Sequence, residues 1–113
     1  MRRLVIAATI CASVLATLVP AHAVIASCYG NEHHQFRTAQ GHPYNPWGLT
    51  AAHRSLPFGT RLRVINNRSG ASVIVRITDR GPFVRGRSLD LSLGACRAIG
   101  NNGLANVSWE IVR

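Results

Sequence analysis

The sequence predicts a small, mainly β protein that closes into a barrel, and three observations lead to this fold class. Apolar and polar residues alternate with a period of two along residues 61–64 and 72–78, as in strands with one buried face. Turns rich in glycine, asparagine and proline separate several further short apolar runs. Only residues 93–99 have the signals of a regular helix. Short strands, tight turns and little helix are typical of a small closed β-barrel.

The start of the chain has the pattern of an export signal. Two arginines precede an uncharged, mostly apolar run that reaches residue 19, and a proline and the small-x-small tripeptide Ala21-His22-Ala23 follow. The run is short for a membrane-spanning helix and no stop-transfer pattern comes after it. We expect residues 1–23 to be a signal peptide and residues 24–113 to be one exported domain without a transmembrane span. A retained N-terminal anchor is the alternative.

The first strand is expected over Val24 to Gly30, and residues 31–48 are expected to form a long loop because glycine, histidine and proline are frequent there. Thr50 is expected to cap a single helical turn that runs through His53 and stops before Pro57.

A hairpin is expected next. The two alternating runs flank the turn Asn66-Asn67-Arg68-Ser69-Gly70. Ile74 interrupts the polar face of the second strand, so that strand is expected to be covered on both sides.

The remaining elements are a loop, a short strand, a helix and a closing strand. Residues 79–87 contain two glycines and a proline and are expected to be a loop, and residues 88–91 a brief strand. Ser92 can cap a helix over residues 93–99, which Gly100 would end. The last strand is expected over residues 105–112.

The net charge indicates which classes of partner the protein can bind. Without residues 1–23 the chain has eleven arginines and no lysine against four acids, a formal charge of +7. Such a charge often marks nucleic-acid binding. Export argues against a nucleic acid, and the arginines are scattered without interleaved aromatic residues. A polyanionic cell envelope is a better partner, and a simple solvated surface is the alternative.

Two cysteines remain in the exported domain, Cys28 and Cys96. An even pair in an oxidising compartment predicts a disulfide. The alternative is lipid anchoring at Cys28, because Ile25-Ala26-Ser27-Cys28 has the apolar-small-small-Cys order of a lipoprotein signal. That motif is separated from the apolar run of the leader, which favours the disulfide.

No metal or other cofactor is expected. The histidines at positions 33, 34, 42 and 53 are the only clustered candidates, and adjacent histidines in a long loop do not form a ligand set of fixed geometry.

Two blocks point to chemistry. In Thr78-Asp79-Arg80-Gly81-Pro82-Phe83 an acid ends an alternating run and leads into a Gly-Pro turn, which is a way to present one carboxylate to a groove. The block Leu49-Thr50-Ala51-Ala52-His53 supplies a histidine. The structural alternatives are that Asp79 caps the turn or pairs with Arg80 or Arg87, and that His53 ends a helical turn.

With these two blocks, the sequence resembles the RlpA-like double-psi β-barrel family. The other matching stretches are residues 26–30, 38–41, 54–60, 73–77, 86–92 and 95–100, so the match covers nearly the whole domain. The resemblance implies a six-stranded double-psi barrel with one or two short helices. It also implies an endolytic lytic transglycosylase that cleaves the β-1,4 bond between N-acetylmuramic acid and N-acetylglucosamine in peptide-poor glycan strands. The product would end in a 1,6-anhydro sugar, and the protein would be a monomer in the periplasm or cell envelope.

The resemblance also assigns roles to residues. Asp79 matches the family's catalytic acid, and His53 matches its histidine. His42 stands where the family usually has an acid, so it either relays protons there or marks a barrel that has lost activity. Substrate binding is assigned to the remaining candidates, Tyr44, Thr50, Arg80 and Phe83. Tyr29 and Trp47 are further aromatic candidates for stacking on sugars, with the protein core as the alternative.

The sequence departs from the family pattern at two more points. Cys28 stands where the family usually has an aromatic residue, and no peptidoglycan-binding repeat follows before Arg113. The alternatives to an enzyme are a non-catalytic glycan-binding module of expansin type and a small stapled structural protein.

Overall fold

The computed structural model of the chain describes residues 23–29 and 37–113. The predicted signal peptide lies outside the described residues except for Ala23, which begins the first strand. The adjacent histidines at positions 33 and 34, which were considered as metal ligands, also lie outside the described residues.

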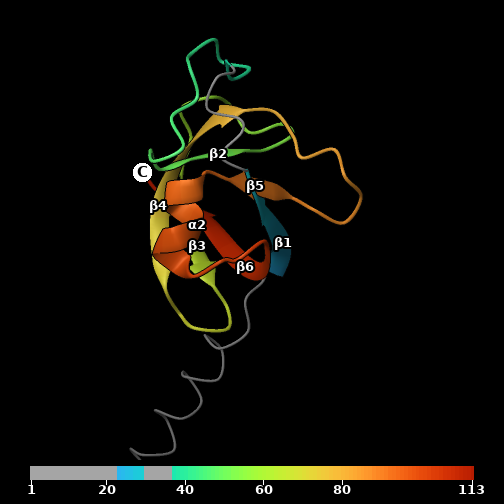
Figure 1. The fold of residues 1–113 in the computed structure, drawn as a ribbon, viewed down its shortest axis with the longest axis vertical. Helices are drawn as coiled ribbons and strands as arrows, with labels where there is room; N and C mark the ends of the chain where they lie inside the picture. Colours follow the sequence, from blue (N-terminus) through green and yellow to red (C-terminus); the bar gives the residue numbers. More distant parts are fainter. Residues whose placement is uncertain (1–22, 30–36) are drawn as a thin grey trace, which may run out of the picture.

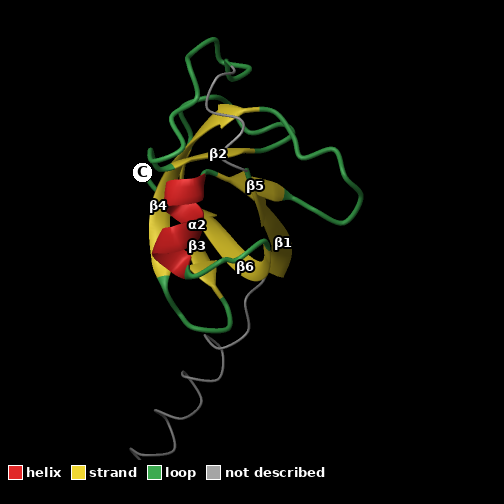
Figure 2. Cartoon of the chain, in the orientation of Figure 1, coloured by secondary structure: helices red, strands yellow, loops and turns green. Residues whose placement is uncertain are grey.

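Six strands close into one barrel with a short helix packed against it (Figures 1 and 2). The order around the barrel is β1-β5-β2-β4-β3-β6, so the first and last strands of the chain pair and complete the closure. Two of the pairs, β1 with β5 and β2 with β4, are parallel. The elements are β1 (Ala23–Cys28), β2 (Thr50–Ala52), β3 (Arg61–Asn66), β4 (Ser72–Asp79), β5 (Leu89–Leu91), α2 (Leu93–Ile99) and β6 (Leu104–Ile111). The mainly β fold, the six-stranded barrel and the short helix predicted from the sequence are confirmed.

The predicted hairpin is β3 and β4, which pair antiparallel across the expected turn. The alternating apolar residues Leu62, Val64, Val75 and Ile77 all lie in the barrel core, because successive side chains of a strand point to opposite faces. Ile74 lies half-buried on the outer face of β4 and lines a groove there, so its covering is only partial.

The predicted helical turn at residues 50–53 is wrong. Thr50–Ala52 forms the strand β2, which pairs parallel with β4 and antiparallel with β5. Three residues cannot nucleate a stable helix on their own, whereas strand pairing on both sides satisfies their backbone groups. Ala51 and Ala52 are fully buried, and their small side chains suit a strand enclosed by the barrel.

The helix α2 has the predicted ends. The Ser92 side chain accepts a hydrogen bond from the Ala95 N–H, and Gly100 adopts the left-handed conformation that ends the helix. The buried face of α2 is made of Ala95, Cys96 and Ile99, which belong to the barrel core.

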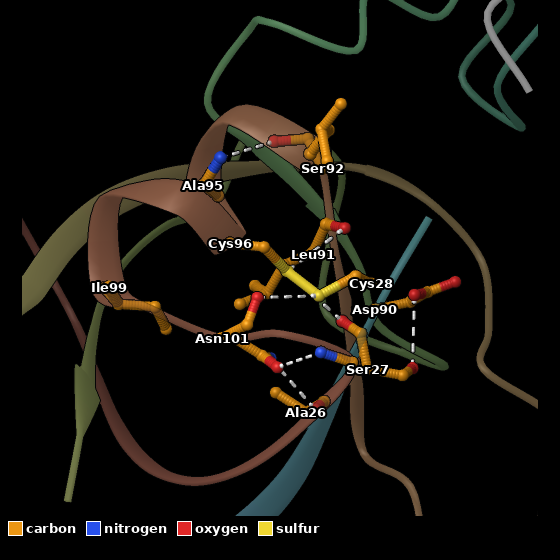
Figure 3. Close-up of a disulfide and its surroundings, with 12 residues drawn as sticks. Ala26, Ser27, Cys28, Asp90, Leu91, Ser92, Ala95, Cys96, Ile99 and Asn101 are labelled. Atoms are coloured by element: carbon orange, nitrogen blue, oxygen red, sulfur yellow. Dashed lines mark hydrogen bonds between the residues drawn. A yellow bond between two sulfur atoms is a disulfide. The ribbon is translucent and has the colours of Figure 1, made fainter. Parts of the chain in front are cut away.

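The predicted disulfide is present and joins the end of β1 to α2. Figure 3 shows the Cys28–Cys96 bond between these two elements. Beside it the Ser27 hydroxyl donates a hydrogen bond to Asp90 at 3.1 Å, which ties β1 to β5 (Figure 3). Asp90 thus has a structural contact within the barrel.

Candidate active site

A groove of about 530 Å³ runs along the outer face of the barrel. Its floor comes from β3 and β4, and its wall comes from the segment that leads into β2. The residues lining it are Thr38, His42, Pro43, Tyr44, Asn45, Gly48, Leu49, Thr50, Arg61, Ile74, Val75, Arg76 and Thr78. Three of the predicted site residues, His42, Tyr44 and Thr50, therefore share one groove.

The wall of the groove is held by the start of α2. The Ser92 hydroxyl donates to the Gly48 carbonyl at 2.6 Å and accepts from the Thr50 N–H at 3.3 Å. The Gly94 N–H donates to the Pro46 carbonyl at 2.8 Å. A side chain at Gly94 would place its Cβ 2.7 Å from the carbonyl oxygen of Trp47, so only glycine fits this approach. The wall is thus set by a buried contact with the helix.

Asp79 stands at the end of β4, directly after the groove residue Thr78. Its Oδ1 accepts hydrogen bonds from the main-chain N–H groups of Ala39 (2.8 Å) and Arg80 (2.9 Å). Its Oδ2 accepts a hydrogen bond from the Tyr29 hydroxyl at 2.8 Å. The turn-capping interpretation is thus correct as far as the Arg80 N–H is concerned. Donors from three segments hold the carboxylate in one orientation.

Tyr29 links this carboxylate to the groove. Burial, followed by the hydrogen bond to Asp79, raises the pKa of the Tyr29 hydroxyl, so it stays protonated and donates. The Tyr29 ring meets the ring of the groove residue Tyr44 edge-on, with centroids 4.9 Å apart. Tyr44 is only 4% exposed, and its hydroxyl accepts from the Leu93 N–H at 3.3 Å. Burial also raises the pKa of Tyr44.

The contact between Tyr29 and Asp79 was not predicted from the sequence, where Tyr29 was a candidate for sugar stacking or for the protein core. The two residues are 50 positions apart, and no local pattern in the sequence signals their contact.

His53 lies next to this cluster but does not bond to the Asp79 carboxylate. Its main-chain N–H donates to the Asp79 carbonyl at 3.2 Å. Its Nδ1 accepts from the N–H groups of Ser55 and Leu56, both at 3.1 Å. Nε2 therefore carries the proton in the neutral ring. Burial, and then the charges of Arg54 and Arg80, lower the pKa of the imidazole.

Two arginines clasp the loops that follow β2 and β4. Arg80 donates to the carbonyls of Leu56 (2.9 Å) and His53 (3.3 Å), and its guanidinium lies over the Phe58 ring. In the opposite direction, Arg54 of the loop after β2 donates to carbonyls of the loop after β4, those of Pro82 (2.9 Å) and Arg87. The forked guanidinium can reach several carbonyls at once.

Two of the residues assigned to substrate binding do not line the groove. The Arg80 guanidinium donates hydrogen bonds to the loop after β2, and Phe83 is 78% exposed in the loop after β4. Their role toward a substrate stays a prediction.

The exposed aromatic residue beside the groove is Trp47. Its ring is 57% exposed, and the Arg97 guanidinium of α2 lies 5.1 Å from the ring centroid. Of the stacking candidates, Trp47 and Phe83 are exposed, whereas Tyr44 is buried at the edge of the groove.

Within residues 23–29 and 37–113, no helix combines the length and apolar character needed to cross a membrane. The same residues contain no group of three or more histidine, cysteine or acidic side chains placed to hold a metal ion.

A comparison against protein families agrees with the fold. The family model described as lytic transglycolase, a double-psi β-barrel domain, matches residues 21–109. The chain belongs to this family.

The relatives narrow the comparison to RlpA-like proteins. The chain is 58% identical over 91 residues to the probable endolytic peptidoglycan transglycosylase RlpA of Synechocystis, covering 79% of this chain and 28% of the relative. It is 46% identical over 87 residues to the endolytic peptidoglycan transglycosylase RlpA of Pseudomonas aeruginosa, covering 75% and 26%. The chain therefore spans about a quarter of the length of these two relatives.

Among solved structures, a Clavibacter michiganensis expansin in complex with cellohexaose superimposes with a TM-score of 0.63 at 25% identity. The match covers 80% of this chain and 50% of the expansin. The Streptomyces papain inhibitor, at 18% identity and a TM-score of 0.63, shares the fold.

Proposed function

We propose that this domain is an endolytic lytic transglycosylase that acts on the glycan strands of peptidoglycan in the periplasm or cell envelope. It would cleave the β-1,4 bond between N-acetylmuramic acid and N-acetylglucosamine in peptide-poor strands and leave a 1,6-anhydro end. The observation that carries the proposal is the Asp79 carboxylate, which hydrogen bonds from three segments hold where β4 leaves the groove. The names of the RlpA relatives support the substrate and the reaction.

Asp79 serves as the acid/base in this proposal. Anhydro-forming cleavage uses the sugar's own 6-hydroxyl as the nucleophile, so no second carboxylate is needed to activate a water. One group can take the proton of the 6-hydroxyl and deliver a proton to the leaving oxygen. The hydrogen bonds from Tyr29 and Ala39 keep the carboxylate oriented for both transfers.

His42 and His53 have different places in the proposal. His42 is exposed in the groove wall, where it can contact the sugar or relay a proton. His53 acts through the loop after β2, because its Nδ1 is used by that loop and its main chain is bonded to Asp79.

The alternative is a glycan-binding barrel without catalysis. The similarity to an expansin crystallised with cellohexaose favours it, as does His42 in place of the usual acid. Both functions need the groove, and only the first makes a new product.

Replacing the carboxylate separates the two. We expect the wild-type chain to release fragments with anhydro ends from purified sacculi treated with an amidase. Asp79→Asn should reduce that rate by about 10²- to 10⁴-fold, because it removes the acid/base. Mass spectrometry of the soluble products measures the rate, and co-sedimentation with sacculi controls for binding. If the wild type binds sacculi but forms no anhydro ends, the transglycosylase is contradicted and the glycan-binding barrel is supported.

Tyr29→Phe tests the orientation of the carboxylate with a smaller change. The variant keeps the ring against Tyr44 and removes only the hydroxyl that donates to Asp79. We expect kcat to fall by about 10- to 100-fold with KM unchanged, because a hydrogen bond to a charged group contributes about 1.5–3 kcal/mol. A rise in KM with kcat unchanged would contradict a role in orienting Asp79.

A further inference from the structure

A row of three polar side chains crosses the groove on the outer face of the barrel. Strand pairing places Thr50 of β2 opposite Arg76 of β4, and Arg76 opposite Arg61 of β3. Residues paired in register project to the same face of a sheet. All three line the groove, so the row forms part of its surface.

The two arginines of this row, the arginine pair, are an unusual arrangement. Like charges directly opposite each other on neighbouring strands destabilise a sheet. No acidic residue lines the groove to offset them. In the described part of the chain, neither the Arg61 nor the Arg76 side chain has a hydrogen bond or ion pair.

The side chains of three other arginines near the groove do have partners. Arg63, two residues along β3, pairs with Glu110 of β6 at 2.7 Å. Arg54 and Arg80 are used by main-chain carbonyls. Unlike these three arginines, the arginine pair leaves two adjacent charges on the surface of the groove.

We propose that the arginine pair is a subsite for a carboxylate carried by the glycan strand. The assignment rests on the proposed function, which places a glycan in this groove. Guanidinium groups bind carboxylates through paired N–H donors and stay charged at any physiological pH. Thr50 adds a hydroxyl beside them.

Two parts of peptidoglycan supply such a carboxylate. One is the lactyl group of N-acetylmuramic acid, whose carboxylate is free when the strand carries no peptide. The other is a carboxylate on the stem peptide. The arginine pair would select strands that bear a negative charge at this point over neutral β-1,4 glucosamine polymers.

Binding of matched tetrasaccharides tests the subsite without requiring turnover. The probes are the alternating N-acetylglucosamine–N-acetylmuramic acid tetrasaccharide with free lactyl acids, the same sugar with neutral lactyl methylamides, and the same sugar with stem peptides on the lactyl groups. Calorimetry with the full chain gives each Kd. We expect the free acid to bind about tenfold tighter than the methylamide, as for a hydrogen-bonded charge. Arg61→Gln/Arg76→Gln should remove the difference.

Arg68→Gln is the control, because it removes one charge from the β3–β4 turn outside the groove. If the wild type binds the free acid and the methylamide equally, the subsite is overturned, with one exception. The exception is that only the stem-bearing sugar binds more tightly than the methylamide and that Arg61→Gln/Arg76→Gln removes this difference in Kd. That result would assign the carboxylate to the peptide. A loss of preference in Arg68→Gln as large as in the double variant would also overturn it. Failure to form anhydro ends, with the preference intact, would count only against the transglycosylase.

Discussion

At the scale of single residues, the site depends on which atoms hold the Asp79 carboxylate. Each of its oxygens accepts at least one hydrogen bond, and the donors come from the end of β1, the loop before β2 and the turn after β4. Two of the donors are main-chain N–H groups, which no substitution at Ala39 or Arg80 other than proline removes. A substitution of Tyr29 can therefore remove one of the hydrogen bonds that orient Asp79.

His53 leads to a prediction for pH. Its pKa in the folded chain is lowered below the ordinary value of 6.5, so between the two values the unfolded chain binds more protons. Stability should therefore be complete above about pH 6.5 and fall as the pH decreases through this window. We expect His53→Asn, whose Oδ1 can replace the Nδ1 acceptor, to lose less stability than the wild type between about pH 7.5 and pH 5. Denaturant unfolding at both pH values measures it, and equal losses would contradict the prediction.

At the scale of elements, the helix α2 shapes the groove. Ser92 caps the helix and at the same time bonds to both Gly48 and Thr50, so one buried hydroxyl serves the helix and the groove wall. The close approach of Gly94 to Trp47 brings the wall against the first turn of the helix. The helix is thus a support for the groove as well as a cover for the core.

Gly94→Ala should show this support. In an ordinary helix the change stabilises by about 1 kcal/mol. Here the new Cβ would lie 2.7 Å from the Trp47 carbonyl oxygen, so we expect a loss of about 1–3 kcal/mol and weaker glycan binding. Denaturant unfolding and calorimetry measure the two effects. Ala98→Gly, at an exposed position of the same helix, is the control for propensity alone. A stabilised Gly94→Ala variant would show that the contact does not constrain the wall.

At the scale of the whole molecule, the barrel is closed by strands from the two ends of the domain. The strand β1 pairs with β6 and with β5, and the disulfide joins its end to α2 across a separation of 68 residues. The bond also holds the backbone directly before Tyr29. Closure of the barrel and placement of the Asp79 partner therefore depend on the same segment.

Removing the disulfide should measure its part in this closure. Loop entropy predicts a loss of about 4 kcal/mol for Cys28→Ala/Cys96→Ala. Urea unfolding with and without a reductant measures the loss. The reductant should destabilise the wild type by a similar amount and leave the double variant unchanged. A wild type that is insensitive to full reduction would contradict a stabilising bond.

The sequence by itself determined the features that depend on neighbouring residues. The period of two in β3 and β4 predicted the hairpin, Ser92 and Gly100 predicted the ends of α2, and the cysteine count predicted the disulfide. The two motif blocks identified the family, since their residue order is visible without a structure, and they marked Asp79 as the candidate acid.

The tertiary structure alone decided what depends on pairing between distant segments. Residues 50–52 became a strand because β4 and β5 satisfy their backbone groups, which overrides the local capping signal of Thr50. Tyr29 meets Asp79, and Thr50, Arg76 and Arg61 align across the groove, only because the barrel closes in one register. A shift of one residue would turn these side chains to the opposite face, and no local pattern in the sequence specifies that register.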